Sequence, residues 1–333
     1  MKNKFKSFLK STPFILTASL VLPVGFSLFV YFIDPKTSFN NDSFDGYHMP
    51  ELEDEFQLNS TTRLFKVANY SSQNNYQGGA FYKNYYFIAA NDLENILIYD
   101  MDSYELEAVV RETDENTLYH CNTIAFGNTF YSPKDRFPLL YISMENAKVH
   151  ATMVYRVHRQ GNYYVTTKVQ QINFPSTAQC GISFPNSYID QKEQKLYYAG
   201  YTGGTYKKQE GNNLKFFRFP LPKAPTEDNK GVDLSTVNLK PEEAEDSFEI
   251  PAETATQGGF VANNHLYQVY GFEKDPLLII TDLRNHQVTY KISIGSVGNY
   301  DEYENIAVYN ERLFAFGIRS LSLYSFDYSY FNL

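Results

Sequence analysis

Tryptophan is absent from this sequence of 333 residues, and cysteine and basic residues are scarce. The two cysteines, Cys121 and Cys180, are too few for a disulfide-built scaffold and lack the spacing of a metal site. The sequence leaves open whether their thiols are buried and reduced or joined outside the cytoplasm. Acidic residues number 38 against 29 basic ones, for a net charge of −9, which argues against a nucleic-acid partner.

The aromatic content is high despite the missing tryptophan. Tyrosine and phenylalanine number 29 and 27, and together they make up 17% of the chain. Aromatic side chains favour the pleated, half-buried surface of a sheet over a helix. A single repetitive all-β domain can use a chain of this length, so the composition indicates one such domain.

The amino-terminal part divides into three segments by charge. Residues 1–12 contain four lysines and no acid, and residues 13–33 contain no charged residue at all. A helix over 13–33 would span about 30 Å, the thickness of a bilayer core, with the lysines on the cytoplasmic side. We therefore predict a transmembrane signal anchor at 13–33, an acidic linker at 34–60 and a folded domain at 61–333 outside the cytoplasm. The alternative is a secreted domain released by signal-peptide cleavage.

The folded part repeats one pattern. A polar residue opens a short apolar run, a tight turn follows, and a second strand begins; this pattern is clear in 77–87, 256–268 and 304–314. Weaker copies begin near His120 and Pro185, and each copy has the length of a four-stranded propeller blade. Since the last copy has only three strands, we expect Arg63 to Val67 to supply its fourth strand and close the ring. The prediction is a five-bladed β-propeller, with one long β-sandwich as the alternative.

The innermost strand of each blade lines the channel of a propeller, so its first residue lies at a channel mouth. The polar residues at these positions are Gln77, His120, Asn122, Asn186, Gln257 and Glu304. Their convergence would suit a small polar ligand, a peptide, a glycan or Ca²⁺, although such a ring also holds ordered water without any ligand. Glu304 is the most informative member, because a carboxylate among amides needs a proton, a cation or a cationic ligand. Asp301 and Glu302 precede it, and one of them is expected to share the mouth.

Two sequence resemblances accompany this pattern. The copies that begin Gln77-Gly78-Gly79 and Thr256-Gln257-Gly258-Gly259 resemble the inner strands of plant-type glutaminyl cyclases, which are five-bladed propellers. Over residues 61–328 the chain looks still more like uncharacterised exported bacterial propellers. The cyclase resemblance implies that Gln257 occupies the central site. The Glu-Gly motif and the tryptophans of that family are missing here, and Glu304 is the one carboxylate at an equivalent strand start.

These observations favour a membrane-anchored, monomeric binding or interaction module over an enzyme, because no nucleophile, metal cluster or cofactor loop is recognisable. No cofactor is expected apart from a possible Ca²⁺ ion. The alternative is a glutaminyl-peptide cyclotransferase-like enzyme that uses Glu304 as its acid-base group.

Overall fold

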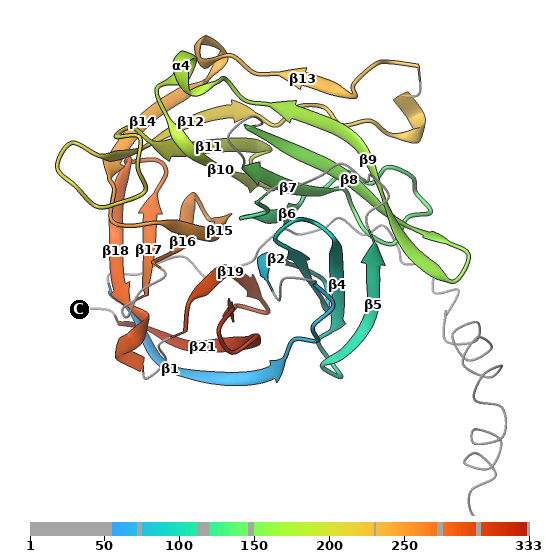
Figure 1. The fold of residues 1–333 in the computed structure, drawn as a ribbon, viewed down its shortest axis with the longest axis horizontal. Helices are drawn as coiled ribbons and strands as arrows, with labels where there is room; N and C mark the ends of the chain where they lie inside the picture. Colours follow the sequence, from blue (N-terminus) through green and yellow to red (C-terminus); the bar gives the residue numbers. More distant parts are fainter. Residues whose placement is uncertain are drawn as a thin grey trace, which may run out of the picture.

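A computed structural model describes residues 55–71, 75–111, 120–145, 150–229, 231–271, 276–297 and 301–331. Their strands form five antiparallel blades arranged in a ring, as Figure 1 shows. Inner strands contact one another in the order β2, β6, β10, β15 and β19, and β19 contacts β2 again. The predicted all-β, five-bladed propeller is therefore confirmed.

Each blade contains four strands. Blade one consists of β2 (Tyr76–Tyr82), β3 (Tyr85–Ala90), β4 (Asn95–Asp100) and β5 (Glu105–Arg111). Blade two consists of β6 (Ile124–Phe126), β7 (Leu140–Glu145), β8 (His150–Gln160) and β9 (Tyr163–Asn173). Blade three consists of β10 (Ser183–Asp190), β11 (Lys195–Tyr201), β12 (Asn213–Pro220) and β14 (Asp246–Pro251), and the short helix α4 (Thr177–Cys180) precedes it. Blade four consists of β15 (Thr256–Ala262), β16 (His265–Tyr270), β17 (Leu277–Asp282) and β18 (Gln287–Ser293), followed by the 3-10 turn η3 (Ile294–Val297).

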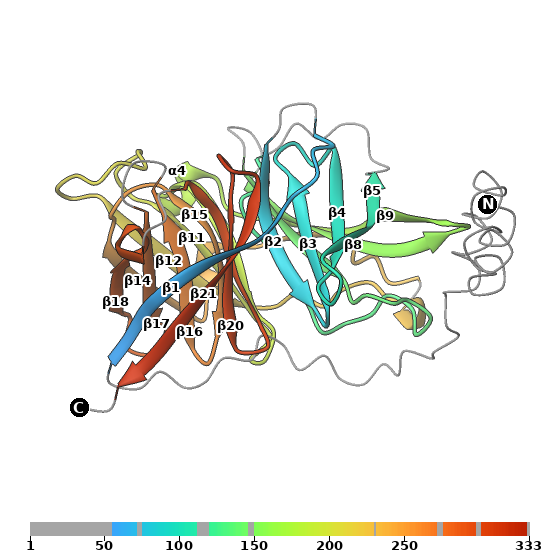
Figure 2. The ribbon, with the colours of Figure 1, turned by 90° about the horizontal axis from the view of Figure 1, so that it is seen from below.

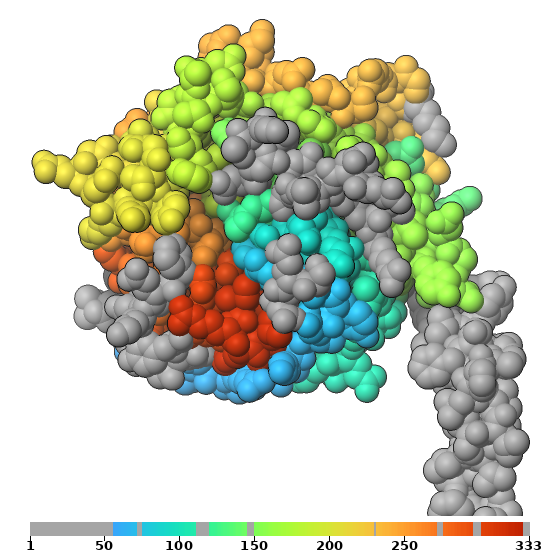
Figure 3. Space-filling model, viewed as in Figure 1, coloured from blue at the N-terminus to red at the C-terminus, as the bar shows by residue number. Residues whose placement is uncertain are grey.

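The fifth blade is completed from the other end of the chain. It consists of β19 (Tyr303–Tyr309), β20 (Arg312–Gly317), β21 (Ser322–Phe331) and β1 (Glu55–Lys66). Strand β1 pairs antiparallel with β21, and the two run side by side in Figure 2. The blue residues of the first strands accordingly lie against the red ones of the last blade in Figure 3. This pairing confirms the predicted closure.

Strand β1 is longer than predicted and begins inside the segment expected to be a linker. The expected linker ended at residue 60, whereas β1 begins at Glu55. Phe56 and Leu58 are buried and pack between blades four and five, while Gln57 between them is exposed. This alternation is a strand signal, and the preceding acidic run obscured it. Residues 55–60 thus belong to the folded domain.

The hydrophobic core lies between the blades. Buried apolar side chains of the described residues group into five clusters, one between each pair of neighbouring blades. Aromatic rings fill much of this space; Phe81 of blade one, for example, stacks on Tyr309 and contacts Phe314 of blade five. Ring pairs of this kind contribute beyond their buried area. The tyrosine and phenylalanine content of the sequence is therefore explained by inter-blade packing.

The tight turns of the repeat also appear as predicted. Asn263 and Asn264 both have positive φ, 49° and 59°, and Asn310 and Glu311 have φ of 47° and 58°. Two successive positive φ values are typical of the turn that matches the twist of a β-hairpin. These turns join the two innermost strands of blades four and five.

The segment between β12 and β14 contains a strand pairing that the sequence did not indicate. The segment includes η1 (Glu227–Asn229), η2 (Pro241–Glu243) and the strand β13 (Thr236–Asn238). Strand β13 pairs parallel with β9, the outer strand of blade two. The insertion therefore leaves blade three, packs on blade two and returns.

Two further predictions have different outcomes. Cys121 and Cys180 are both buried in separate core clusters and form no disulfide, which settles the alternatives left open by the sequence.

Among the described residues no helix is long and apolar enough to cross a membrane. The predicted anchor at 13–33 lies outside those residues.

Candidate functional site

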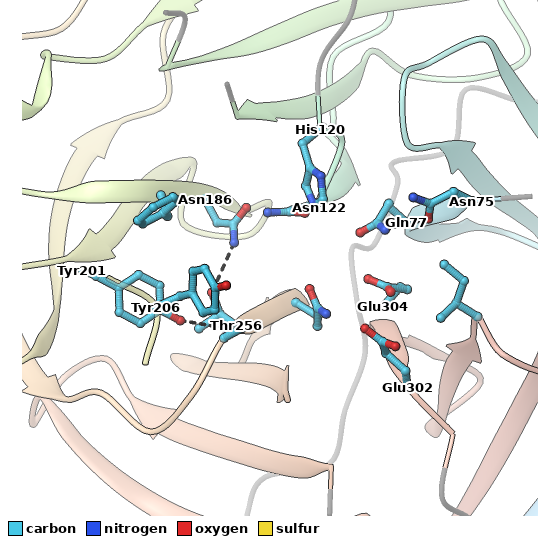
Figure 4. A pocket seen from close by; sticks show the side chains of 14 residues that line it. Asn75, Gln77, His120, Asn122, Asn186, Tyr201, Tyr206, Thr256, Glu302 and Glu304 are labelled. Carbon is cyan, nitrogen blue, oxygen red and sulfur yellow. Dashed lines mark hydrogen bonds between the residues drawn. The ribbon is translucent and has the colours of Figure 1, made fainter. Parts of the chain in front are cut away.

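A cavity of about 450 Å³ opens where the five inner strands begin. All six side chains predicted to face the channel mouth line it, and Figure 4 shows most of them around the opening. They are Gln77, His120, Asn122, Asn186, Gln257 and Glu304. The five blades thus contribute at least one polar residue each to a single cavity, while ligand binding there remains a prediction.

A shared backbone irregularity lies at these positions. Four of the inner strands change register with their neighbouring strand near their first residues, which is a β-bulge. A bulge places extra residues on one strand and re-aims their side chains, and bulges are common beside functional sites. In β2, β10 and β15 two residues lie opposite one on the neighbouring strand, namely Gln77 and Gly78, Phe184 and Pro185, and Gln257 and Gly258; in β19 Glu304 is the extra residue.

The residue after each site residue fastens its blade to a neighbour. Asn305 donates from Nδ2 to the carbonyl oxygen of Gln77 at 2.6 Å and accepts the Tyr86 hydroxyl at 3.1 Å. Thr123 Oγ1 donates to the carbonyl oxygen of Ser187 at 2.6 Å. These bonds hold blade five against blade one and blade two against blade three, directly beside the cavity.

Glycine serves the same purpose where backbones approach most closely. The Gly78 N–H donates to the carbonyl oxygen of Cys121 at 3.0 Å, and a Cβ on Gly78 would lie 2.8 Å from Ile124 Cγ2. A Cβ on Gly258 would lie 2.7 Å from both the Glu304 carbonyl oxygen and Asn305 Cα. A larger residue would push blade one from blade two, or blade four from blade five. The site residues are therefore positioned by the closure of the ring.

One side of the cavity is acidic. Glu304 is 2% exposed, and Figure 4 places it beside Gln77 and Glu302. Burial, together with the negative charges of Glu302 and Asp301, raises the pKa of Glu304 to about 8. Burial also raises the pKa of Glu302, an effect opposed by Arg319, whose Nε lies 3.5 Å from Glu302 Oε2. At neutral pH Glu304 is mostly protonated unless a cation lies next to it.

Of the two acids preceding Glu304, only Glu302 lines the cavity. Asp301 Oδ1 instead accepts the backbone N–H groups of Glu302 at 2.8 Å and Arg319 at 2.9 Å. Its Oδ2 accepts the backbone N–H and the hydroxyl of Ser320. Asp301 therefore fastens the turn between β20 and β21 and adds negative charge from behind.

The amides contribute buried acceptors. Gln77 donates from Nε2 to Asn75 Oδ1 at 2.9 Å, and Asn186 donates from Nδ2 to Thr256 Oγ1 at 3.3 Å. Gln77 Oε1, Asn186 Oδ1 and Glu304 Oε2 are buried and accept no hydrogen bond from the described residues. Buried acceptors normally have a donor, so these atoms favour a ligand or solvent rich in donors. Burial lowers the pKa of His120, so its imidazole is neutral at neutral pH.

The opposite side of the cavity is aromatic, and the sequence interpretation missed it. Tyr201 and Tyr206 lie there in Figure 4, away from the acids. Phe184, in the bulge of β10, also lines the cavity, and its ring meets that of Tyr206 edge to face with centroids 5.7 Å apart. The signal for Phe184 was Pro185, since proline inside a strand indicates a bulge. Tyr206 lies on a glycine-containing loop, where strand periodicity gives no information.

The donor set does not form an obvious metal centre. Within the described ranges no group of three or more His, Cys, Asp and Glu side chains is arranged to hold a metal ion. The lining residues include neither lysine nor arginine. The cavity thus combines two carboxyl groups, several amide oxygens and aromatic rings, without a nucleophile paired to a base.

Comparison with known proteins assigns no family to this chain. No family model matches the chain, and no curated protein does either. Among solved structures, the PQQ-bound form of aldose sugar dehydrogenase from Streptomyces coelicolor is similar with 9% identity and a TM-score of 0.48, covering 84% of this chain and all of that one. Glutaminyl cyclase from Myxococcus xanthus is similar with 13% identity and a TM-score of 0.46, covering 83% of this chain and 97% of that one. At such low identity these likenesses assign no activity, and the resemblance to exported bacterial propellers stays a prediction.

Proposed function

We propose that this chain is an extracytoplasmic binding protein, held at the membrane by residues 13–33, whose propeller presents a polar ligand site at one mouth of its channel. One observation carries the proposal: polar side chains from all five blades line the same cavity. Buried acceptors that have no donor among the described residues, among them Gln77 Oε1 and Asn186 Oδ1, support it further.

The test is a thermal-shift screen of the purified full-length chain in mild detergent against amino acids, amines, short peptides, glycans and Ca²⁺. A ligand at about 100 times its Kd adds about 2.7 kcal/mol, which raises the Tm of a domain of this size by about 5 °C. Gln77→Ala and Asn186→Ala should each reduce the shift. The control Gln287→Ala changes an exposed amide on outer strand β18 and should leave the shift intact. Failure of every compound to stabilise the chain would refute the proposal.

The anchor has its own test. The full-length chain expressed in a bacterial host should sediment with membranes, and protease added outside the inner membrane should remove the propeller. A shortened chain recovered in the soluble extracytoplasmic fraction would instead indicate cleavage and secretion.

A second candidate is supported by Glu304. A carboxyl group with a pKa near 8 inside a polar cavity suits general acid-base catalysis near neutral pH. In cyclisation of an amino-terminal glutaminyl residue, the α-amine attacks the side-chain carboxamide carbon, the ring closes and ammonia leaves. Glu304 would carry the proton from the attacking amine to the leaving nitrogen, and Gln257 would donate to the developing oxyanion. Cyclisation by the purified chain that Glu304→Gln abolishes would establish this candidate over simple binding.

A further inference from the structure

The two sides of the cavity differ in chemistry, and this difference restricts the ligand. Figure 4 separates Glu302, Glu304 and Gln77 on one side from Tyr201 and Tyr206 on the other. We propose that the site takes primary amines that carry an aromatic ring, with the ammonium group on the acidic side and the ring against Phe184 and Tyr206. This inference rests on the proposed function and adds the ligand class to it.

The acidic side matches an ammonium group in charge and in donor count. An ammonium has three N–H donors and no acceptor. Glu304 Oε2 and Gln77 Oε1 are buried acceptors without a donor among the described residues, and the Glu302 carboxylate lines the same side. Among the described residues no cationic side chain lines the cavity, and Arg319, which is not a lining residue, contacts Glu302 at 3.5 Å. A ligand cation therefore meets attraction without competition inside the cavity, whereas a ligand carboxylate would meet two acids.

The aromatic side offers an apolar surface that the fold leaves open. Phe184 and Tyr206 are 38% and 37% exposed, although both are large and lie next to a cavity. Phe184 has φ of 52°, a backbone conformation that is an outlier for a bulky residue. Strain of this kind persists where the surrounding structure enforces it, and it is concentrated at ligand sites. Phe184 and Tyr206 thus present an exposed aromatic surface beside the cavity, against which a ligand ring can pack.

Hydrogen bonds from the buried Asn212 side chain fix the loop that carries Tyr206. Asn212 is 3% exposed and donates from Nδ2 to the carbonyl oxygens of Thr205 and Lys207, both at 2.8 Å. Its Oδ1 accepts the Gly203 N–H at 2.8 Å. These bonds fix the backbone on both sides of Tyr206, so the aromatic side is formed before a ligand arrives. A preformed surface lowers the entropy cost of binding.

The experiment is isothermal calorimetry on the full-length chain with four matched probes: 2-phenylethylamine, ethylamine, 2-phenylethanol and 3-phenylpropionate. We expect 2-phenylethylamine to bind at least about tenfold more tightly than ethylamine or the alcohol. The carboxylate should not bind. Equal affinity for the amine and the alcohol would overturn the inference.

Two variants separate the contributions of ring and charge. Phe184→Gly removes the ring and also relieves the positive φ, so the variant should fold at least as well as the natural chain. It should reduce the affinity for 2-phenylethylamine toward that for ethylamine and leave ethylamine unchanged. Glu304→Gln should weaken both amines by about tenfold or more and leave the alcohol unchanged. A merely structural role would change all probes alike and would contradict the assignment.

The outcomes also separate this inference from the proposed function. If no amine binds, but Ca²⁺, a glycan or a peptide stabilises the chain in a way that Gln77→Ala and Asn186→Ala abolish, the ligand class is wrong and the site stands. If no compound in either experiment binds, both are overturned.

Discussion

The substitution Glu304→Gln should make protein stability less dependent on pH in a calculable way. Folding raises the pKa of Glu304 from an ordinary value of 4.5 to about 8. When folding raises the pKa of a carboxyl group, the free energy of unfolding has its full value below the unfolded pKa. It then falls as pH rises toward the folded pKa and levels off above it. Glutamine has nearly the same shape as the protonated acid and no charge to lose, so the variant should lack this decline.

The magnitude follows from the interval between the two pKa values. At about 1.4 kcal/mol for each pH unit, the interval corresponds to about 5 kcal/mol. The free energy of unfolding of the variant should therefore equal that of the natural protein near about pH 4.5 and exceed it by several kcal/mol near about pH 8. Glu304 is 2% exposed, so solvent screening reduces this difference little.

The assay is urea unfolding followed by circular dichroism at a series of pH values, for the natural chain, Glu304→Gln and the control Glu249→Gln. Glu249 is exposed on β14, so its variant should follow the natural chain. Other titrating groups are shared by all three chains and cancel in the difference. A constant difference between Glu304→Gln and the natural chain across the series would refute the view that an uncompensated acid is buried at the channel mouth.

Three further predictions concern closure and binding. Deleting residues 1–66 removes β1 and exposes the edge of β21, so the shortened chain should aggregate and have a lower Tm. Deleting residues 1–54 keeps β1 and should leave a monomeric folded domain. Size-exclusion chromatography and the Tm of each chain test both outcomes. Asn305→Ala removes the hydrogen bonds to the buried Gln77 carbonyl and to the Tyr86 hydroxyl, which should lower the free energy of unfolding by about 1–3 kcal/mol in urea unfolding. Affinity for 2-phenylethylamine should rise about tenfold for each pH unit up to about pH 8, because Glu304 must lose its proton to bind the ammonium group. In calorimetry Glu304→Gln should abolish this dependence on pH. The other charged or titratable groups near Glu304 are Glu302, Asp301, His120 and Arg319.

The sequence predicted the blades well because the repeat signals are local. A polar residue, glycines, an apolar run and a tight turn all lie within a dozen neighbours, and strand pairing within a blade joins sequential hairpins. The closing strand was predicted from the missing fourth strand of the last blade, although its length was not. Residues 51–55 are all acids except Leu52, and this acidic run indicated a linker. It obscured the alternation of Phe56 and Leu58, which marks the first half of β1.

Features that depend on distant contacts were not predictable. Strand β13 pairs with β9 across a long separation in sequence, and its three residues carry no distinctive pattern. The aromatic side of the cavity depends on a bulge in β10 and on the hydrogen bonds by which Asn212 fixes the loop that carries Tyr206. Neither feature produces a periodic pattern in the sequence. The polar side was predicted because its members each open an apolar run and recur once in every blade.

The placement of the site residues follows from how the ring closes. In each blade a polar side chain that faces the cavity is followed at once by a residue that contacts another blade. The pairs are Gln77 and Gly78, Asn122 and Thr123, Asn186 and Ser187, Gln257 and Gly258, and Glu304 and Asn305. One position of each pair thus faces the cavity while the next contacts a neighbouring blade. The first positions can therefore change to suit a different ligand at little cost in stability, whereas the second positions cannot change without loosening the ring.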